Sequence, residues 1–219
     1  MTAHVVTVTN QKGGCGKSTV SSMLCSTLSK RGIRVLLVDA DAQGTSTAWA
    51  KAAPENASFS VPVINFSAYA EKIHREIQKQ LDKYEIIVVD CGPSLESLPP
   101  LSALLVSNLA IIPVTPSPAD LWAARGAKTL IERAQLINED LRAVVLANRT
   151  GHTTLSRAIL NELDDFGIPL MNSRLSTRVA YQEAILSGVA VSDLGRDAKP
   201  AADEVSAMTD EVLALLGER

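Results

Sequence analysis

The chain has 219 residues, of which 46% are hydrophobic and 21% charged, so we expect one large globular domain that spans residues 1–219. Its formal net charge of −3 excludes a uniformly basic protein, and any nucleic-acid contact must come from a local patch. The three cysteines form no CxxC pair, which argues against structural zinc, and no apolar run reaches the ~20 residues of a membrane span.

Apolar runs and helical patterns alternate along the chain. Apolar runs predict strands over 5–9, 35–38, 61–66, 86–90, 109–114, 143–146 and 169–172. Helical spacing predicts helices over 18–31, 46–51, 69–84, 98–107, 120–137, 154–166, 178–187 and 201–216. Aromatic residues make up only 4% of the chain, and a core of Val, Ile, Leu and Ala suits a buried parallel sheet. We therefore predict an α/β fold with a single doubly wound, mostly parallel sheet flanked by helices on both faces.

The first turn between a strand and a helix is rich in glycine and reads KGGCGKST over residues 12–19. Glycines let backbone N–H groups turn inward, and together with a helix N-terminus these groups can hold phosphate oxygens. Lys17 is placed to reach the β- and γ-phosphates of a nucleotide, and the Ser18 hydroxyl is a suitable Mg²⁺ ligand. The backbone of the predicted cradle comes from Gly13, Gly14, Cys15 and Gly16.

The loop departs from the commonest phosphate-binding pattern in one respect. That pattern has glycine five residues before Gly16, where this chain has Gln11. The next residue, Lys12, places a second lysine at the start of the loop.

Carboxylates follow two of the predicted strands. Asp39 and Asp41 follow the strand over 35–38, and Asp90 ends the strand over 86–90. A carboxylate at the end of a buried strand is costly unless it meets a cation or donors, so Asp39 and Asp90 are candidates to hold Mg²⁺ directly or through water. The alternative for a single aspartate is a helix cap or a turn. Asp41 is the candidate to orient attacking water, and Gly92 would let a backbone N–H approach the γ-phosphate.

These motifs, in this order, resemble those of the ParA/MinD family of P-loop ATPases. Residues 12–19 resemble its deviant Walker A motif, and 38–44 look like its switch I segment, with Ala42 in place of proline. Residues 89–95 look like its switch II, and 112–118 are similar to its next strand and proline-rich loop. The resemblance covers nearly the whole chain and is greatest to the small ParA proteins of plasmid partition and cargo positioning. Ala42 removes no chemical group, so we expect activity to survive.

The resemblance implies an ATP hydrolase that uses ATP and Mg²⁺. The resemblance also implies that Lys12 reaches across an ATP-bridged homodimer to the partner's nucleotide, where it acts like an arginine finger. Lys17 binds the β- and γ-phosphates, Thr19 contacts the α-phosphate, and Asp41 acts in hydrolysis. Ser18 binds Mg²⁺, which Asp39 and Asp90 support through water. Asn148 contacts adenine.

The resemblance also implies a DNA surface and a protein partner. ParA-like ATP dimers bind chromosomal DNA without sequence preference, and a ParB-like or adaptor partner bound to the cargo stimulates hydrolysis. Such a protein is cytoplasmic and associated with the nucleoid. The region 142–199 is rich in arginine, and it could form a basic face that dimerisation doubles. For any single arginine, an ordinary solvated surface is the alternative. The candidates for DNA contact are Arg149, Arg157, Arg174 and Arg178.

Three other classes provide alternatives. A MinD-type ATPase binds membrane through a basic amphipathic C-terminal helix, but here the helix over 201–216 has an acidic face, so we expect it to pack in the core and expect no membrane partner. Liposome sedimentation with ATP would test this. An iron–sulfur carrier of the same superfamily needs a bridging cysteine pair that is missing here. Metabolic ligases related to dethiobiotin synthetase lack a lysine at the position of Lys12.

A plasmid, a chromosome region and a protein compartment such as a carboxysome all suit this type of ATPase as cargo. The neighbouring gene would discriminate between them. A small basic DNA-binding protein encoded there indicates plasmid partition, and a carboxysome operon indicates compartment positioning.

Overall fold

A seven-stranded sheet forms the centre of the molecule, with strand order β3-β2-β4-β1-β5-β6-β7 and parallel pairing throughout. The computed structural model describes residues 3–57, 61–93, 98–151, 158–159, 161–163 and 166–217. The strands are β1 (His4–Val8), β2 (Val35–Ala40), β3 (Val63–Asn65), β4 (Ile86–Cys91), β5 (Leu109–Val114), β6 (Arg142–Thr150) and β7 (Leu170–Ser176). This topology confirms the predicted doubly wound α/β fold.

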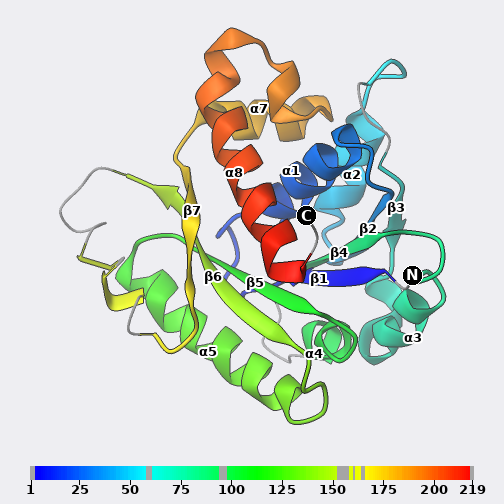
Figure 1. Cartoon of the computed structure of the whole chain (residues 1–219), viewed down its shortest axis with the longest axis vertical. Coiled ribbons are helices and arrows are strands. Elements are labelled where there is room, and N and C mark those ends of the chain that lie inside the picture. Colours follow the sequence, from blue (N-terminus) through cyan, green and yellow to red (C-terminus); the bar gives the residue numbers. More distant parts are fainter. Residues whose placement is uncertain are drawn as a thin grey trace.

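Helices cover both faces of the sheet, with α1, α2, α7 and α8 on one face and α3, α4 and α5 on the other (Figure 1). The pleat of the strands explains the two layers: in β1, Val6 and Val8 pack toward α1 and α8, whereas Val5 packs toward α3. The helices are α1 (Lys17–Lys30), α2 (Thr45–Ala52), α3 (Ile73–Gln78), α4 (Leu98–Leu104), α5 (Pro118–Gln135), α7 (Val179–Ser187) and α8 (Lys199–Leu216). Short 3₁₀ turns are η1 (Ser67–Lys72), η2 (Val191–Asp193) and η3 (Arg196–Ala198).

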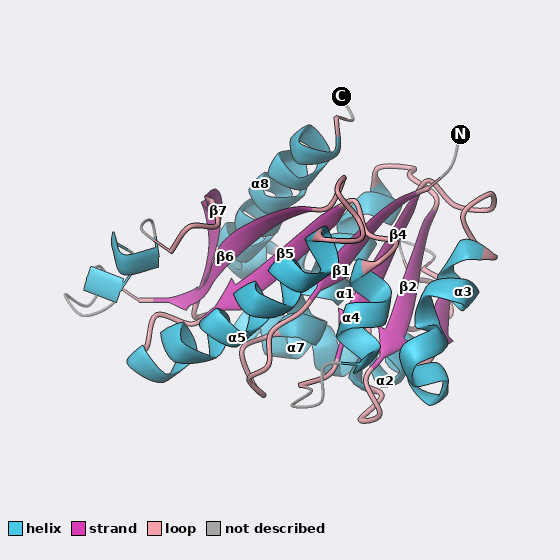
Figure 2. Cartoon of the chain, turned by 90° about the horizontal axis from the view of Figure 1, so that it is seen from below, coloured by secondary structure: helices cyan, strands magenta, loops and turns pink. Residues whose placement is uncertain are grey.

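The central strand β1 carries the glycine-rich loop. It pairs with β4 on one side and with β5 on the other, so the loop that follows it lies where connections diverge to the two halves of the sheet (Figure 2). In open α/β sheets, ligands bind in the crevice at such a point, at the carboxyl ends of the strands. The topology therefore brings the loop together with the residues that follow β2, β4, β5 and β6.

The edge strand β7 is longer than the predicted strand over 169–172, and β6 is longer than the one over 143–146. The additional residues of β7 are mostly polar, and an apolar run therefore does not mark them. Two glutamates of α8 satisfy backbone N–H groups of this edge: Glu211 accepts from Ser173 and Asn172, and Glu204 accepts from Ser176. The acidic residues of α8 therefore support the sheet edge as well as facing solvent.

The apolar face of α8 is buried, as the sequence predicted. Val205, Met208 and Val212 are at most 1% exposed in the core cluster that includes α1 and β7. The apolar positions of this helix therefore pack in the protein interior. Within the described part of the chain, we find no helix that is long and apolar enough to cross a membrane.

The prediction of one helix over 69–84 was wrong. The chain there forms η1, a backbone kink at Ala70 and the short helix α3, and turns follow. Ile73 and Ile77 are buried as predicted, but the carbonyl of Leu81 accepts from the N–H of Ala3 at the start of the sheet. The helix has already ended at Gln78, and this bond ties the turns that follow it to the start of β1. The predicted helix over 154–166 lies largely outside the described residues.

Candidate nucleotide site

The glycine-rich loop has the backbone that a phosphate cradle requires. Gly14 and Gly16 are left-handed, with φ of 77° and 93°, and Gly13 and Gly14 face open space. Lys17 is only 6% exposed, and its ammonium donates to the backbone carbonyl of Lys12 (2.8 Å). The loop therefore encloses a cation beside two glycines that face open space, and this arrangement suits a nucleotide phosphate.

Asn148, at the end of β6, holds this loop from the side. Its amide Nδ2 donates to the carbonyl of Cys15 (2.7 Å), and its Oδ1 accepts from the N–H of Arg149 (2.9 Å). A Cβ at Gly16 would lie 2.2 Å from this Nδ2, so the close approach requires glycine. The contact that Asn148 makes in the structure is with the loop, and its predicted contact with adenine stays a prediction.

Asp39 and Asp90 lie side by side at the carboxyl ends of β2 and β4, where they are register partners. Both are fully buried. Asp90 accepts from the hydroxyls of Ser46 (2.7 Å) and Ser21 (3.4 Å), neither of which the sequence singled out. No sequence pattern signals these contacts, because Ser21 and Ser46 are ordinary helical serines.

The surroundings of Asp90 disfavour the ionised form of its carboxyl group. Burial raises its pKa to about 6, although hydrogen bonds from Ser46 and Ser18 oppose the shift. The Asp39 carboxylate raises this pKa further, and the Lys17 ammonium lowers it. The hydroxyl of Ser18, the predicted Mg²⁺ ligand, is thus next to a buried pair of carboxylates. This set of hard oxygen donors suits Mg²⁺.

Asp39 also has the structural role that the alternative interpretation gave it. Its Oδ2 accepts from the backbone N–H (2.8 Å) and the hydroxyl (2.7 Å) of Thr47 in the first turn of α2, and its Oδ1 accepts from the N–H of Asp41 (3.2 Å). The carboxylate therefore fixes the loop that carries Asp41, and its predicted support of Mg²⁺ stays a prediction.

Asp41 and Gly92 bring the two switch-like segments into contact. The Asp41 Oδ1 accepts from the N–H of Gln43 (3.0 Å), and a Cβ on Gly92 would lie 2.8 Å from this oxygen. A side chain at position 92 would therefore displace the Asp41 carboxylate. Ser94 and Leu95, which complete the switch II motif, lie outside the described residues.

Lys12 lies outside the cradle, against the start of α5. Its Nζ is 2.6 Å from the Oδ2 of Asp120, a carboxylate whose side chain is 5% exposed, while the Lys12 side chain is 36% exposed. Ser117 forms the N-cap of α5, and its hydroxyl hydrogen-bonds the same oxygen. The sequence did not single out Asp120, and no motif signals a partner 108 residues away.

The predicted DNA residues come together in part. Arg149, near the end of β6, and Arg174, in β7, are both exposed, and the two strands pair there, with Arg174 opposite Ala147 and Ser176 opposite Thr150. Arg178 is committed elsewhere, because its guanidinium donates to Glu204 at 2.7 and 3.0 Å. These hydrogen bonds raise the pKa of Arg178. Arg157 lies outside the described residues.

Arg149 has a left-handed backbone, with φ of 53°, which is uncommon for a residue other than glycine. Two hydrogen bonds hold this conformation: the Arg149 N–H donates to the Asn148 side chain, and the Arg149 carbonyl accepts from the Thr177 hydroxyl. The exposed guanidinium is therefore carried by a fixed backbone beside the loop.

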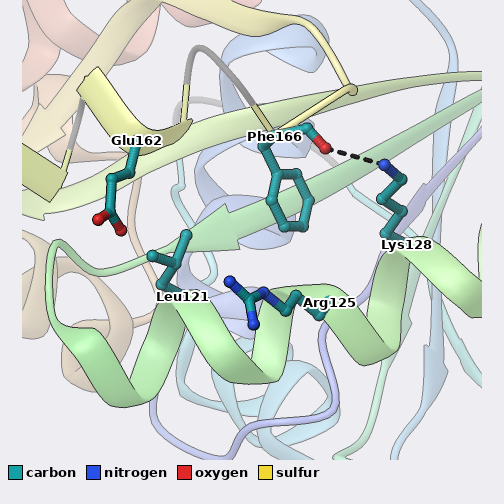
Figure 3. A pocket seen from close by; sticks show the side chains of 5 residues that line it. All are labelled: Leu121, Arg125, Lys128, Glu162 and Phe166. Carbon is teal, nitrogen blue, oxygen red and sulfur yellow. Dashed lines mark hydrogen bonds between the residues drawn. The ribbon is translucent and has the colours of Figure 1, made fainter.

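A groove of about 410 Å³ lies along α5, and the residues that line it are not among the predicted site residues. Figure 3 shows Leu121, Arg125 and Lys128 on the helix, with Glu162 and Phe166 across from them. Lys128 donates to the carbonyl of Phe166 (2.9 Å) and lies 5.6 Å from the centre of its ring. These contacts join α5 to the segment that precedes β7.

In the nucleotide-free protein, Asp90→Asn should increase the free energy of unfolding at pH 8 by an amount on the order of 2 kcal/mol. The pKa of about 6 lies above the ordinary 3.8, so the folded state favours the protonated carboxyl. The contribution of the protonated Asp90 carboxyl to the free energy of unfolding is complete below about pH 4, and it is lost as the pH rises to 6. Urea denaturation of both proteins at pH 4, 5, 6 and 8 measures the difference. A pH-independent gain, or an equal gain from Asn at the exposed Asp140, would contradict the assignment.

Taken together, the fold and the loop define a P-loop nucleotide-binding protein. The family model described as "CobQ/CobB/MinD/ParA nucleotide binding domain" matches residues 6–191. The chain belongs to this family, which confirms the family expected from its motifs.

The chain is 34% identical over 212 residues to "Maintenance of carboxysome distribution protein A" of Halothiobacillus neapolitanus, with 96% of this chain and 97% of that protein covered. Among solved structures, it is similar to the ATP complex of a Cyanothece McdA variant, with a TM-score of 0.79, 14% identity, and coverage of 99% and 97% of the two chains. It is also similar to the Mg-ADP complex of the septum site-determining protein MinD of Pyrococcus horikoshii, with a TM-score of 0.75, 21% identity and 98% coverage of both.

Proposed function

We propose that the chain is a Mg²⁺-dependent ATPase that dimerises around ATP, binds nucleoid DNA without sequence preference and positions a cargo. The favoured cargo is a carboxysome, because the relative from Halothiobacillus neapolitanus, similar over nearly the whole chain, is named for carboxysome distribution. A partner bound to the cargo stimulates hydrolysis and so releases the dimer from DNA.

The observation that carries this proposal is the separation of the two loop lysines. Lys17 is buried inside the loop, whereas the Nζ of Lys12 lies outside it on α5. Lys17 is placed to bind the phosphates of the nucleotide in its own subunit. An additional lysine on the outer side of the same loop suits the phosphates of a second subunit.

Bound Mg²⁺–ATP would supply the transferable phosphoryl group and the metal charge that offsets its phosphates. The residues of this chain bind and orient it: Ser18 provides a metal ligand, and Asp90 and Asp39 support it from the buried side. Asp41 orients the attacking water from the loop after β2. Its contact with Gly92 lets a change in one switch segment reach the other.

Arg174→Ala should weaken binding of the ATP-bound dimer to duplex DNA of arbitrary sequence. It should also reduce the slope of log affinity against log salt by about two, one phosphate contact per subunit. Arg178→Ala should have a smaller effect because Glu204 already binds its guanidinium. Fluorescence anisotropy with ATP across a salt series measures both quantities.

The matched control is Arg142→Ala, since this exposed arginine lies at the opposite end of β6 from Arg149. Binding that responds neither to salt nor to Arg174→Ala would sink the assignment of this surface. A loss of equal size in the Arg142 variant would show that net charge, and not this surface, determines binding.

A further inference from the structure

The first half of the loop rests on the unit formed by β5 and α5. The Asn10 amide donates to the carbonyl of Pro113 at the end of β5 (2.8 Å), and Lys12 pairs with Asp120 in the first turn of α5. Gln11 lies so close to Gly126 that a Cβ there would be 2.1 Å from its Oε1. Three consecutive residues therefore contact one structural unit. They include Gln11, where the loop departs from the common phosphate-binding pattern, and the second lysine, Lys12.

Within the Lys12–Asp120 pair, the carboxylate is the fixed member. Asp120 is 4% exposed, and its backbone N–H donates to the Ser117 hydroxyl. Its negative charge lies in the first turn of α5, where the helix dipole favours an anion, and the Ser117 hydroxyl also hydrogen-bonds its Oδ2. Asp120 therefore keeps favourable partners without Lys12. The lysine is more exposed and has a flexible side chain, so it is the member that can leave.

We propose that Asp120 is a positioning residue that holds Lys12 in its own subunit until an ATP-bound second copy competes for it. This inference rests on the proposed function, in which Lys12 serves the nucleotide of the partner subunit. Closing the dimer moves one ammonium in each subunit from Asp120 to a phosphate. Breaking the Lys12–Asp120 pair in each subunit costs free energy, which raises the protein concentration at which the dimer forms. Asp120 therefore limits how readily the dimer forms.

The test is the dissociation constant of the dimer, measured by sedimentation velocity with a non-hydrolysable ATP analogue and Mg²⁺. Asp120→Asn keeps the size of the side chain and an acceptor for Ser117 but removes the charge that holds Lys12. We expect a dissociation constant about tenfold lower, because two pairs no longer oppose each dimer. Asp193→Asn, which removes the partner of Lys30 far along the chain from the loop, should leave it unchanged.

A second measurement reads the pair directly in the nucleotide-free protein. Acetylation of Lys12 by acetic anhydride, followed by mass spectrometry, should be several-fold faster in the Asp120→Asn variant than in the wild type. Lys79, which pairs with Glu76 on α3, serves as the internal control and should react at the same rate in both proteins.

The outcomes separate this proposal from the proposed function. If wild type dimerises with the analogue and Asp120→Asn dimerises equally or more weakly, the holding role is overturned, and a weaker dimer would mean that Asp120 orients Lys12 toward the partner. Unchanged acetylation of Lys12 would also overturn it. If wild type does not dimerise at all, the proposed function fails first.

Discussion

Lys12→Ala should reduce partner-stimulated ATP hydrolysis by about a thousandfold or more while leaving nucleotide binding by the monomer largely intact. A cation supplied to the phosphates from the second subunit stabilises charge in the transition state, and removing it affects the rate more than the binding of substrate. Lys17 keeps its position in this variant, because the group that accepts from its ammonium is the backbone carbonyl of residue 12.

Two measurements distinguish these effects. Fluorescent ATP binding reports on the monomer, and steady-state turnover with the protein encoded by the neighbouring gene, added as the activator, reports on stimulated hydrolysis. Lys79→Ala is the control, since it removes another partly exposed, ion-paired lysine from α3. Normal stimulated turnover in the Lys12 variant would falsify the role of Lys12 in the partner subunit. A loss of nucleotide binding as large as the loss of turnover would assign Lys12 to its own subunit's site.

The effect of the Lys12 substitution on stability depends on the ion pair between Lys12 and Asp120. Asp120 is nearly buried, and a buried carboxylate that loses its cation normally destabilises the fold. Here the Ser117 hydroxyl and the N-terminal end of α5 remain beside it. The variant should therefore stay folded, so that its kinetics report on catalysis.

The parts of the site that could be predicted from the sequence are those that local patterns determine. Continuous apolar runs identify the buried strands, and in a parallel sheet their carboxyl ends meet at one edge. This reasoning was sufficient to bring the loop at 12–19 together with Asp39 and Asp90. A cap or turn was also foreseen as the alternative for Asp39, which accepts from the N–H of Asp41 in the following loop and from Thr47 in the first turn of α2, although Gly44 is the N-cap of that helix.

The contacts that sequence patterns could not show are those between distant segments. Asn148 reaches Cys15 across 133 residues, and Lys12 reaches Asp120 across 108. The rule for the carboxyl ends of the strands places Asn148 at the same edge as the loop, but no periodic pattern identifies either of the two contacts. The extent of β7 was missed for a related reason: the residues that extend it are mostly polar, and Glu204 and Glu211 of α8, which accept from backbone N–H groups of this strand, are distant in the sequence.

Asp41→Ala should slow ATP hydrolysis by about a hundredfold or more and accumulate the ATP-bound dimer. The carboxylate is positioned by the Gln43 N–H and by its contact with the backbone of Gly92, and Asp39 holds the start of the same loop. Removing it takes away the group that orients water but leaves the phosphate cradle and Lys12 unchanged. Binding of ATP and closure of the dimer should therefore continue while the step that opens the dimer fails.

Gel filtration with ATP and Mg²⁺ measures the dimer, and phosphate release measures turnover. Wild type should return to monomer as ATP is consumed, whereas the Asp41 variant should remain a dimer over the same time. Gln43→Ala provides the control, because it changes an exposed side chain of the same loop and keeps the backbone N–H that Asp41 accepts from. If the Asp41 variant elutes only as a monomer, the carboxylate is needed for closure. If it hydrolyses ATP at the rate of the wild type, the water is oriented by another group. A stable, slowly hydrolysing dimer would support the assignment of Asp41 to hydrolysis and show that dimer formation requires only bound ATP.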